Sequence, residues 1–113
     1  METYSSIQDK LHRGFELHES GRFAEACSLY LQAWADTQER MRADGIQDLK
    51  GLQAACSWFD YVTNWIQDIE EHLLPLCRTD PSWHSRRIRY CEQVIPLAGL
   101  GNDLMVENFR RSI

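Results

Sequence analysis

Three groups of residues in this chain of 113 have types and spacings that could do chemistry. His12 and Glu16 are four residues apart, so on a helix they share one face, where they could seat a metal ion or supply a general base. His18 lies about 240° around the same helix from His12 and cannot easily bind the same ion. Such a pair is usually a solvated part of a surface helix, and we expect neither a metal site nor a catalytic residue here.

The second group is a polar row in which Asp60, Asn64 and Asp68 recur every four residues and His72 continues the pattern. On a helix the two aspartates would be about 12 Å apart, too far to share a proton or to flank one scissile bond. We therefore expect a solvated helix face. A small metal-dependent enzyme or regulator, using His72 or the first group, is the alternative from another functional class.

The third group is basic. Arg86, Arg87 and Arg89 lie close together beside Trp83, and arginines interleaved with aromatic rings could stack on single-stranded RNA. The chain carries a formal net charge of -5, however, which opposes binding to a phosphate backbone. We expect these arginines to pair with glutamates such as Glu70, and RNA binding through Arg86 to Arg89 stays an alternative rather than the main interpretation.

Other reactive side chains give no site. Four cysteines are spaced 29, 21 and 14 residues apart, without the Cys-x-x-Cys pair that would indicate zinc or redox chemistry. No serine lies in a Gly-x-Ser-x-Gly motif, and there is no glycine-rich phosphate loop or His-Glu-x-x-His motif. The sequence predicts a protein that is not an enzyme and has no cofactor. We expect reduced thiols in the core at Cys27, Cys56, Cys77 and Cys91.

Length and composition suit one globular domain over residues 1–113. Hydrophobic residues make up 43% of the chain and charged residues 26%, which is ordinary for a folded protein. No apolar run approaches the roughly 20 residues that cross a bilayer, and the N-terminus lacks the pattern of a signal peptide. We expect a cytoplasmic protein that does not bind membranes.

Apolar periodicity predicts an all-α fold of about five helices, with no competing strand pattern. The first two helices form a hairpin over residues 7–40, joined by a turn around Gly21. Gly14 lies inside the first helix, which suggests that another helix approaches closely there. In the second helix we expect Phe23 to face inward.

Proline and capping signals set the later helices. We expect Pro75 to end a long central helix, because proline cannot donate to the helical hydrogen-bond ladder. Asp80 followed by Pro81 resembles an N-cap with proline at the first helical position. The helices expected after the hairpin cover residues 46–74, 81–97 and 102–113.

The hairpin resembles the tetratricopeptide repeat, a 34-residue helical hairpin whose signature positions are small or aromatic. It departs from that pattern at Lys10, where the repeat prefers tryptophan, and at Gln38, where a proline usually ends the second helix. The resemblance implies a right-handed stack of helical hairpins. The matching positions are Gly14, Leu17, Gly21, Phe23, Ala26, Tyr30 and Ala33.

Three further segments are similar to a family of bacterial tetratricopeptide-like proteins, some of which carry an SEC-C zinc motif. These segments are NWIQDIEEHLL (64–74), RRIRYCEQVI (86–95) and NDLMVENFRRSI (102–113). The cysteine-rich zinc cluster of that motif is absent here, so its metal function does not carry over. The last segment resembles the first half of another repeat, as if the second half were missing.

The resemblance implies a non-enzymatic scaffold that binds a protein or peptide, or a second copy of itself as a homodimer. Tetratricopeptide arrays bind peptides in a groove lined by the first helix of each repeat. Leu11 and Phe15 stand where the subclass that clamps a carboxylate terminus has lysine and asparagine. The groove is therefore expected to be apolar and to take an amphipathic helix or another copy of the chain. We expect partner contacts at Leu11, Phe15, Trp65 and Phe109.

Overall fold

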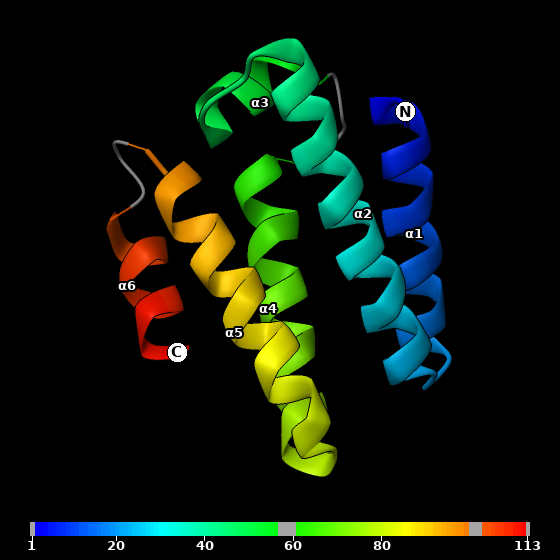
Figure 1. The fold of residues 1–113 in the computed structure, drawn as a ribbon. Coiled ribbons are helices and arrows are strands. Elements are labelled where there is room, and N and C mark those ends of the chain that lie inside the picture. The colour runs from blue at the N-terminus through cyan, green and yellow to red at the C-terminus, as the bar shows by residue number, and fades with distance from the viewer. Residues whose placement is uncertain (1, 57–60, 100–102, 113) are drawn as a thin grey trace. The chain divides into compact units, whose positions relative to one another are not determined.

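The computed structural model describes residues 2–56, 61–99 and 103–112, and every regular element within these ranges is helical (Figure 1). The all-α prediction is confirmed, but these ranges contain six α-helices rather than the expected five. Two short 3-10 turns, η1 and η2, flank the fifth helix. The elements are α1 Tyr4–Glu19, α2 Phe23–Asp44, α3 Leu49–Ala55, α4 Val62–Thr79, η1 Pro81–Trp83, α5 His84–Val94, η2 Ile95–Leu97 and α6 Asp103–Ser112.

The chain divides into two compact units, Met1–Ile46 and Gln47–Ile113. The first, the hairpin unit, contains α1 and α2. The second unit contains α3 to α6. Among the described residues, no helix is both long enough and apolar enough to cross a membrane.

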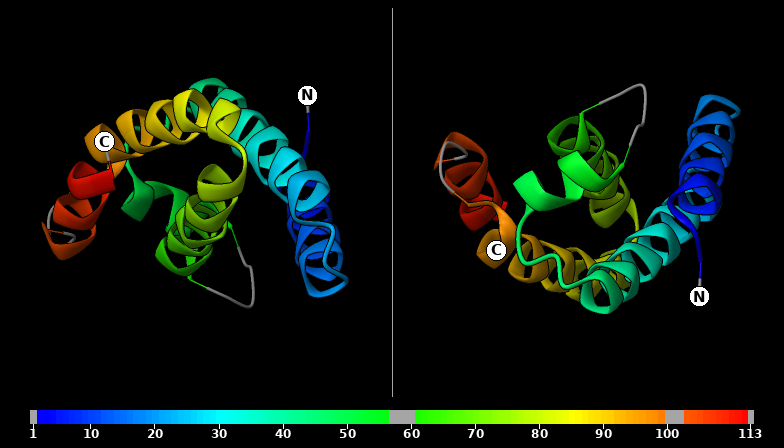
Figure 2. Two further views of the ribbon diagram at one scale, coloured as in Figure 1. Left: turned by 90° about the horizontal axis from the view of Figure 1, so that it is seen from below. Right: turned by 90° about the horizontal axis from the view of Figure 1, so that it is seen from above.

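In the hairpin unit, α1 and α2 pack side by side and run in opposite directions (Figures 1 and 2). Gly21 makes the turn between them with φ +82°, a left-handed conformation that favours glycine. A second left-handed glycine, Gly45 at φ +69°, caps the end of α2. The helices therefore cover the range in which the sequence predicts a hairpin and extend beyond it at both ends.

Gly14 lies at a close approach of the two helices. A Cβ atom added at Gly14 would lie 2.5 Å from Cε1 and 2.8 Å from Cδ1 of Tyr30. Both distances are shorter than carbon atoms tolerate, so only glycine lets the buried Tyr30 ring lie against α1. Close packing thus explains a glycine inside a helix.

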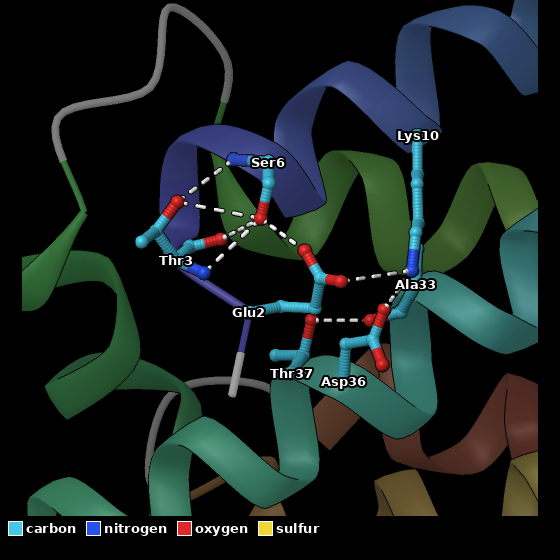
Figure 3. Close-up of polar contacts among 7 residues, drawn as sticks. All are labelled: Glu2, Thr3, Ser6, Lys10, Ala33, Asp36 and Thr37. Atoms are coloured by element: carbon cyan, nitrogen blue, oxygen red, sulfur yellow. Dashed lines mark hydrogen bonds and ion pairs between the residues drawn. The ribbon is translucent and has the colours of Figure 1, made fainter.

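Polar contacts fasten the start of α1 (Figure 3). The hydroxyls of Thr3 and Ser6 form a capping box, in which each accepts a hydrogen bond from the backbone N–H of the other residue. Lys10 binds Asp36 of α2 and lies 3.7 Å from the Glu2 carboxylate. The hydrogen bond to Asp36 raises the pKa of Lys10, and the hydrogen bond from Ser6 lowers the pKa of Glu2.

The long helix predicted over residues 46–74 is wrong, because the chain leaves the helical conformation after α3. Cys56 and Tyr61 are both extended, with ψ 140°, on either side of the undescribed residues 57–60. The first N–H of α4, that of Val62, donates to Oε1 of Gln53 at 2.6 Å, so α3 supplies a hydrogen-bond partner for the start of α4. The apolar periodicity continues across the break because α3 and α4 each bury their own apolar face.

Pro75 also fails to end a helix: it lies inside α4, which continues to Thr79. Pro75 is exposed, whereas Leu73 and Cys77 on either side of it are buried. Burial of that face stabilises the helix enough to offset the hydrogen bond that proline cannot make.

The segment after α4 begins with a turn rather than an α-helix. Asp80 accepts a hydrogen bond from the Ser82 N–H, and Pro81 occupies the first position, as the sequence predicts. The helix expected over residues 81–97 is divided into η1, α5 and η2. The hydrogen bonds from Ser82 lower the pKa of Asp80.

In the second unit, α5 contacts both α4 and α6 (Figure 2). An ion pair joins α5 to α4, with Arg87 Nε and one of its terminal nitrogens each 3.0 Å from Glu70 Oε1. The Tyr90 hydroxyl donates to the Ile66 carbonyl of α4 at 2.7 Å. On the other side, the ring of Phe109 from α6 lies 6.1 Å from the ring of Tyr90.

Candidate functional site

The structure separates the four expected partner contacts into two classes. Leu11, Trp65 and Phe109 are 3%, 2% and 2% exposed, so they belong to the core of the described chain. Their burial follows from the apolar stripes of α1, α4 and α6, and a partner could touch them only if they became uncovered. Phe15 is only partly buried. All four remain predictions as partner contacts, and Phe15 is the accessible one.

Phe15 belongs to an aromatic row on the hairpin unit, formed by Phe15, His18, Phe23 and Tyr30. The rings of Phe15 and Tyr30 are 5.3 Å apart, and those of His18 and Phe23 are 4.9 Å apart in an edge-on arrangement. Both spacings are typical of favourable aromatic pairs. The row is buried at Tyr30 and opens to solvent at Phe23, whose exposed fraction is 49%.

Helix geometry places the four rings in one row. Phe15 and His18 are three residues apart, so they are neighbours along α1. Phe23 and Tyr30 are seven residues apart, two turns along the same face of α2. The turn at Gly21 then brings the end of α1 beside the beginning of α2.

The expectation that Phe23 faces inward is wrong, because about half of its side chain is exposed. Its position on α2 does follow the buried stripe, but it is the first residue of the helix. Residues Gly21 to Glu25 are all exposed, because few atoms cover the end of a hairpin. The turn signal at Gly21 could have revealed this, since a residue two positions after a turn lies at the edge of the packed region.

Carboxylates accompany the aromatic row on α1. Glu19 is four residues after Phe15 and therefore next to it on the helix surface, and Glu16 follows Phe15 directly; both are exposed. On α2, Arg22 pairs with Glu25 at 3.3 Å across the first turn. The accessible side of Phe15 is thus bordered by negative charge.

A hollow of about 290 Å³ lies near the same end of the hairpin. Arg13 and Leu17 of its lining lie about 160° around α1 from Phe15, and Glu16 of its lining lies about 100° from Phe15. The hollow is therefore centred on another side of the helix than the aromatic row, and Glu16 lies between the two. Its wall consists mainly of charged and polar side chains that face solvent. The lining residues are Arg13, Glu16, Leu17, Ser20 and Arg22.

The candidate metal-binding and acid–base residues do not come together in one site. Within residues 2–56, 61–99 and 103–112, no three His, Cys, Asp or Glu side chains are placed to hold a metal ion. Asn64 is exposed, and Asp68 and His72 are partly buried on α4. Asp60, the first member of that row, lies outside the described residues.

The three arginines of the possible RNA site have different surroundings. Arg87 is buried and bound to Glu70, as expected, with side-chain exposures of 9% and 13%. The Arg86 guanidinium lies 4.4 Å from the centre of the Trp83 ring, and that ring belongs to a residue only 5% exposed. Trp83 therefore offers no open face for a stacked base, although Arg86 and Arg89 are themselves exposed.

All four cysteines are buried free thiols, which confirms the prediction of core cysteines. Burial raises the pKa of Cys56 and that of Cys91 to about 11, and it also raises the pKa of Cys77. A raised pKa leaves little thiolate at neutral pH, so Cys56, Cys77 and Cys91 are poor nucleophiles. The aromatic row is left as the candidate functional site.

Comparison with known proteins adds no relative to this account. No protein-family model, no curated protein and no solved structure matches the chain.

Proposed function

We propose that this protein is a non-enzymatic module that binds a protein or peptide, or a second copy of itself, at the exposed end of the aromatic row. The observation that carries the proposal is Phe23: it is 49% exposed and packs edge-on against His18 at 4.9 Å. A ring that is held in place on one side and open on the other can receive an apolar side chain at little conformational cost.

The accessible side of Phe15 extends this surface along α1. Phe15 is fixed by Tyr30, and Tyr30 is fixed by the close approach at Gly14. The surface is therefore preorganised, which reduces the entropy that a partner must remove on binding. We call Phe15, His18 and Phe23 the hairpin surface.

The resemblance of the hairpin to a tetratricopeptide repeat supports the same function. Such arrays bind peptides with the first helix of each repeat, and Phe15 belongs to the first helix here. The small residue at Gly14 serves in this chain as the repeat pattern requires, by allowing two helices to touch.

A selection from a displayed peptide library, with the full chain immobilised, tests the proposal. We expect the selected peptides to share an apolar or aromatic anchor. Their Kd, measured by calorimetry, should rise at least tenfold in Phe23→Ala, which corresponds to about 1.4 kcal/mol of lost binding free energy.

Leu104→Ala is the matched control, because Leu104 of α6 is 72% exposed and also loses an apolar side chain. Its affinity for the peptides should equal that of the parent protein. A library that yields no binding peptide, or peptides that bind Phe23→Ala as tightly as the parent, would overturn the proposal.

A further inference from the structure

The charges around the hairpin surface indicate what kind of partner it fits. Glu19 lies about 40° from Phe15 around α1 and Glu16 about 100° from it, on the same side. Both carboxylates are exposed. Phe15 therefore has negative charge beside it along the edge of α1 that a partner would approach.

The two cations of α1 lie elsewhere. Arg13 is about 160° from Phe15 around the helix, and Lys10 is about 140° from it. Lys10 is also occupied by Asp36 and Glu2 (Figure 3). Arg13 does lie about 60° from Glu16 and lines the same hollow, so Glu16 has a cation beside it. Glu19 lies about 120° from Arg13, so it has no α1 cation beside it.

The first turn of α2 does not reverse this balance. Arg22 is the cation nearest in sequence to Phe23, and its pair with Glu25 cancels its charge locally. The hairpin unit as a whole contains five Lys and Arg against eight Asp and Glu, a net charge of -3 over residues 1–46. This negative field would attract a cationic partner both near the surface and at longer range.

We infer that the partner of the hairpin surface is a cationic protein segment that inserts one apolar side chain at Phe23 and places Lys or Arg beside Glu19, on the side of α1 that also carries Glu16. An arginine in that position could also lie over the accessible face of Phe15, since guanidinium groups favour aromatic faces. This inference rests on the proposed function and adds to that function the charge of the partner.

The peptides selected on the full chain test the inference by their composition. They should carry more positive charge than the unselected library, in addition to the apolar anchor. The variant Glu16→Gln/Glu19→Gln should raise their Kd about five- to tenfold at 50 mM NaCl. The difference should disappear at 1 M NaCl, where the screening length is about 3 Å.

Glu71→Gln/Glu92→Gln is the matched control, because it removes two exposed carboxylates from the second unit. It should leave the Kd within twofold of the parent value. Equal weakening in both double variants would show a non-specific charge effect and would overturn the inference.

The two proposals fail in different ways. Peptides that depend on Phe23 but are neutral or acidic, or that ignore Glu16→Gln/Glu19→Gln, overturn the cationic partner and leave the binding surface standing. Peptides that are cationic but bind Phe23→Ala normally overturn the proposed function, and with it the apolar anchor. A monomer–dimer equilibrium that Phe23→Ala abolishes, with no cationic peptide selected, would identify a second copy as the occupant instead.

Discussion

At the scale of single residues, the hairpin surface depends on the contact between Gly14 and Tyr30. The absent Cβ of Gly14 lets the Tyr30 ring lie flush against α1, and Tyr30 in turn supports Phe15 at a ring spacing of 5.3 Å. Alanine normally stabilises a helix interior by about 1 kcal/mol relative to glycine. In this position its Cβ has no room.

Gly14→Ala should therefore destabilise the protein by about 1 to 3 kcal/mol, because overpacking outweighs the gain in helix propensity. Urea denaturation followed by circular dichroism measures the change. In a double-mutant cycle with Tyr30→Leu, the two losses should sum to more than the loss in the double variant, since the smaller side chain relieves the clash. A Gly14→Ala protein as stable as the parent would contradict this packing.

The sequence also shows its limits at this scale. Phe15 could be selected from the apolar stripe of α1, but the same reasoning selected Leu11, Trp65 and Phe109, which are buried. Periodicity identifies which face of a helix is covered, and it does not say how far the cover extends. Phe23 lies on a covered face and is half exposed because the hairpin ends there.

At the scale of elements, the presence of helices is easier to predict than the residues at which they begin and end. The hairpin could be anticipated because Gly21 punctuates two periodic stretches and Gly14 marks a close approach. The interruption between α3 and α4 could not, because Leu52 and Ile66 fit one helical stripe whether or not the helix is continuous. The prediction at Pro75 is wrong for the opposite reason. A local rule predicts that the helix ends at proline, but burial of Leu73 and Cys77 in the core keeps the helix going.

The ion pair between Arg87 and Glu70 gives a test at this scale, since it joins α5 to α4. Arg87→Ala should destabilise the protein by about 3 kcal/mol, because it leaves a largely buried carboxylate without its cation. Thermal unfolding of the purified variants measures the loss.

Replacing both partners should be milder, and Arg87→Met/Glu70→Leu should recover most of the lost stability. Arg110→Ala serves as the control, because Arg110 is exposed on α6 and its loss should change stability by less than about 0.5 kcal/mol. If Arg87→Ala were no more destabilising than this control, the ion pair would not hold α5 to α4.

At the scale of the whole molecule, the chain is a pair of compact helical units of similar net charge, -3 over residues 1–46 and -2 over residues 47–113. The hairpin unit combines a net charge of -3 with an aromatic row that opens to solvent at Phe23. In the second unit Arg87 is buried against Glu70 and Arg86 lies against Trp83, while Arg89 and Arg110 are exposed. The aromatic row, rather than the charge, therefore favours the hairpin unit as the place where a partner binds.

Hydrogen–deuterium exchange of the full chain, with and without the tightest selected peptide, tests that claim most directly. Binding at the hairpin surface should slow exchange in the second half of α1 and the first turns of α2, over about residues 12–27, and leave α5 and α6 unchanged. Protection confined to α5 or α6, with residues 12–27 unaffected, would contradict the account.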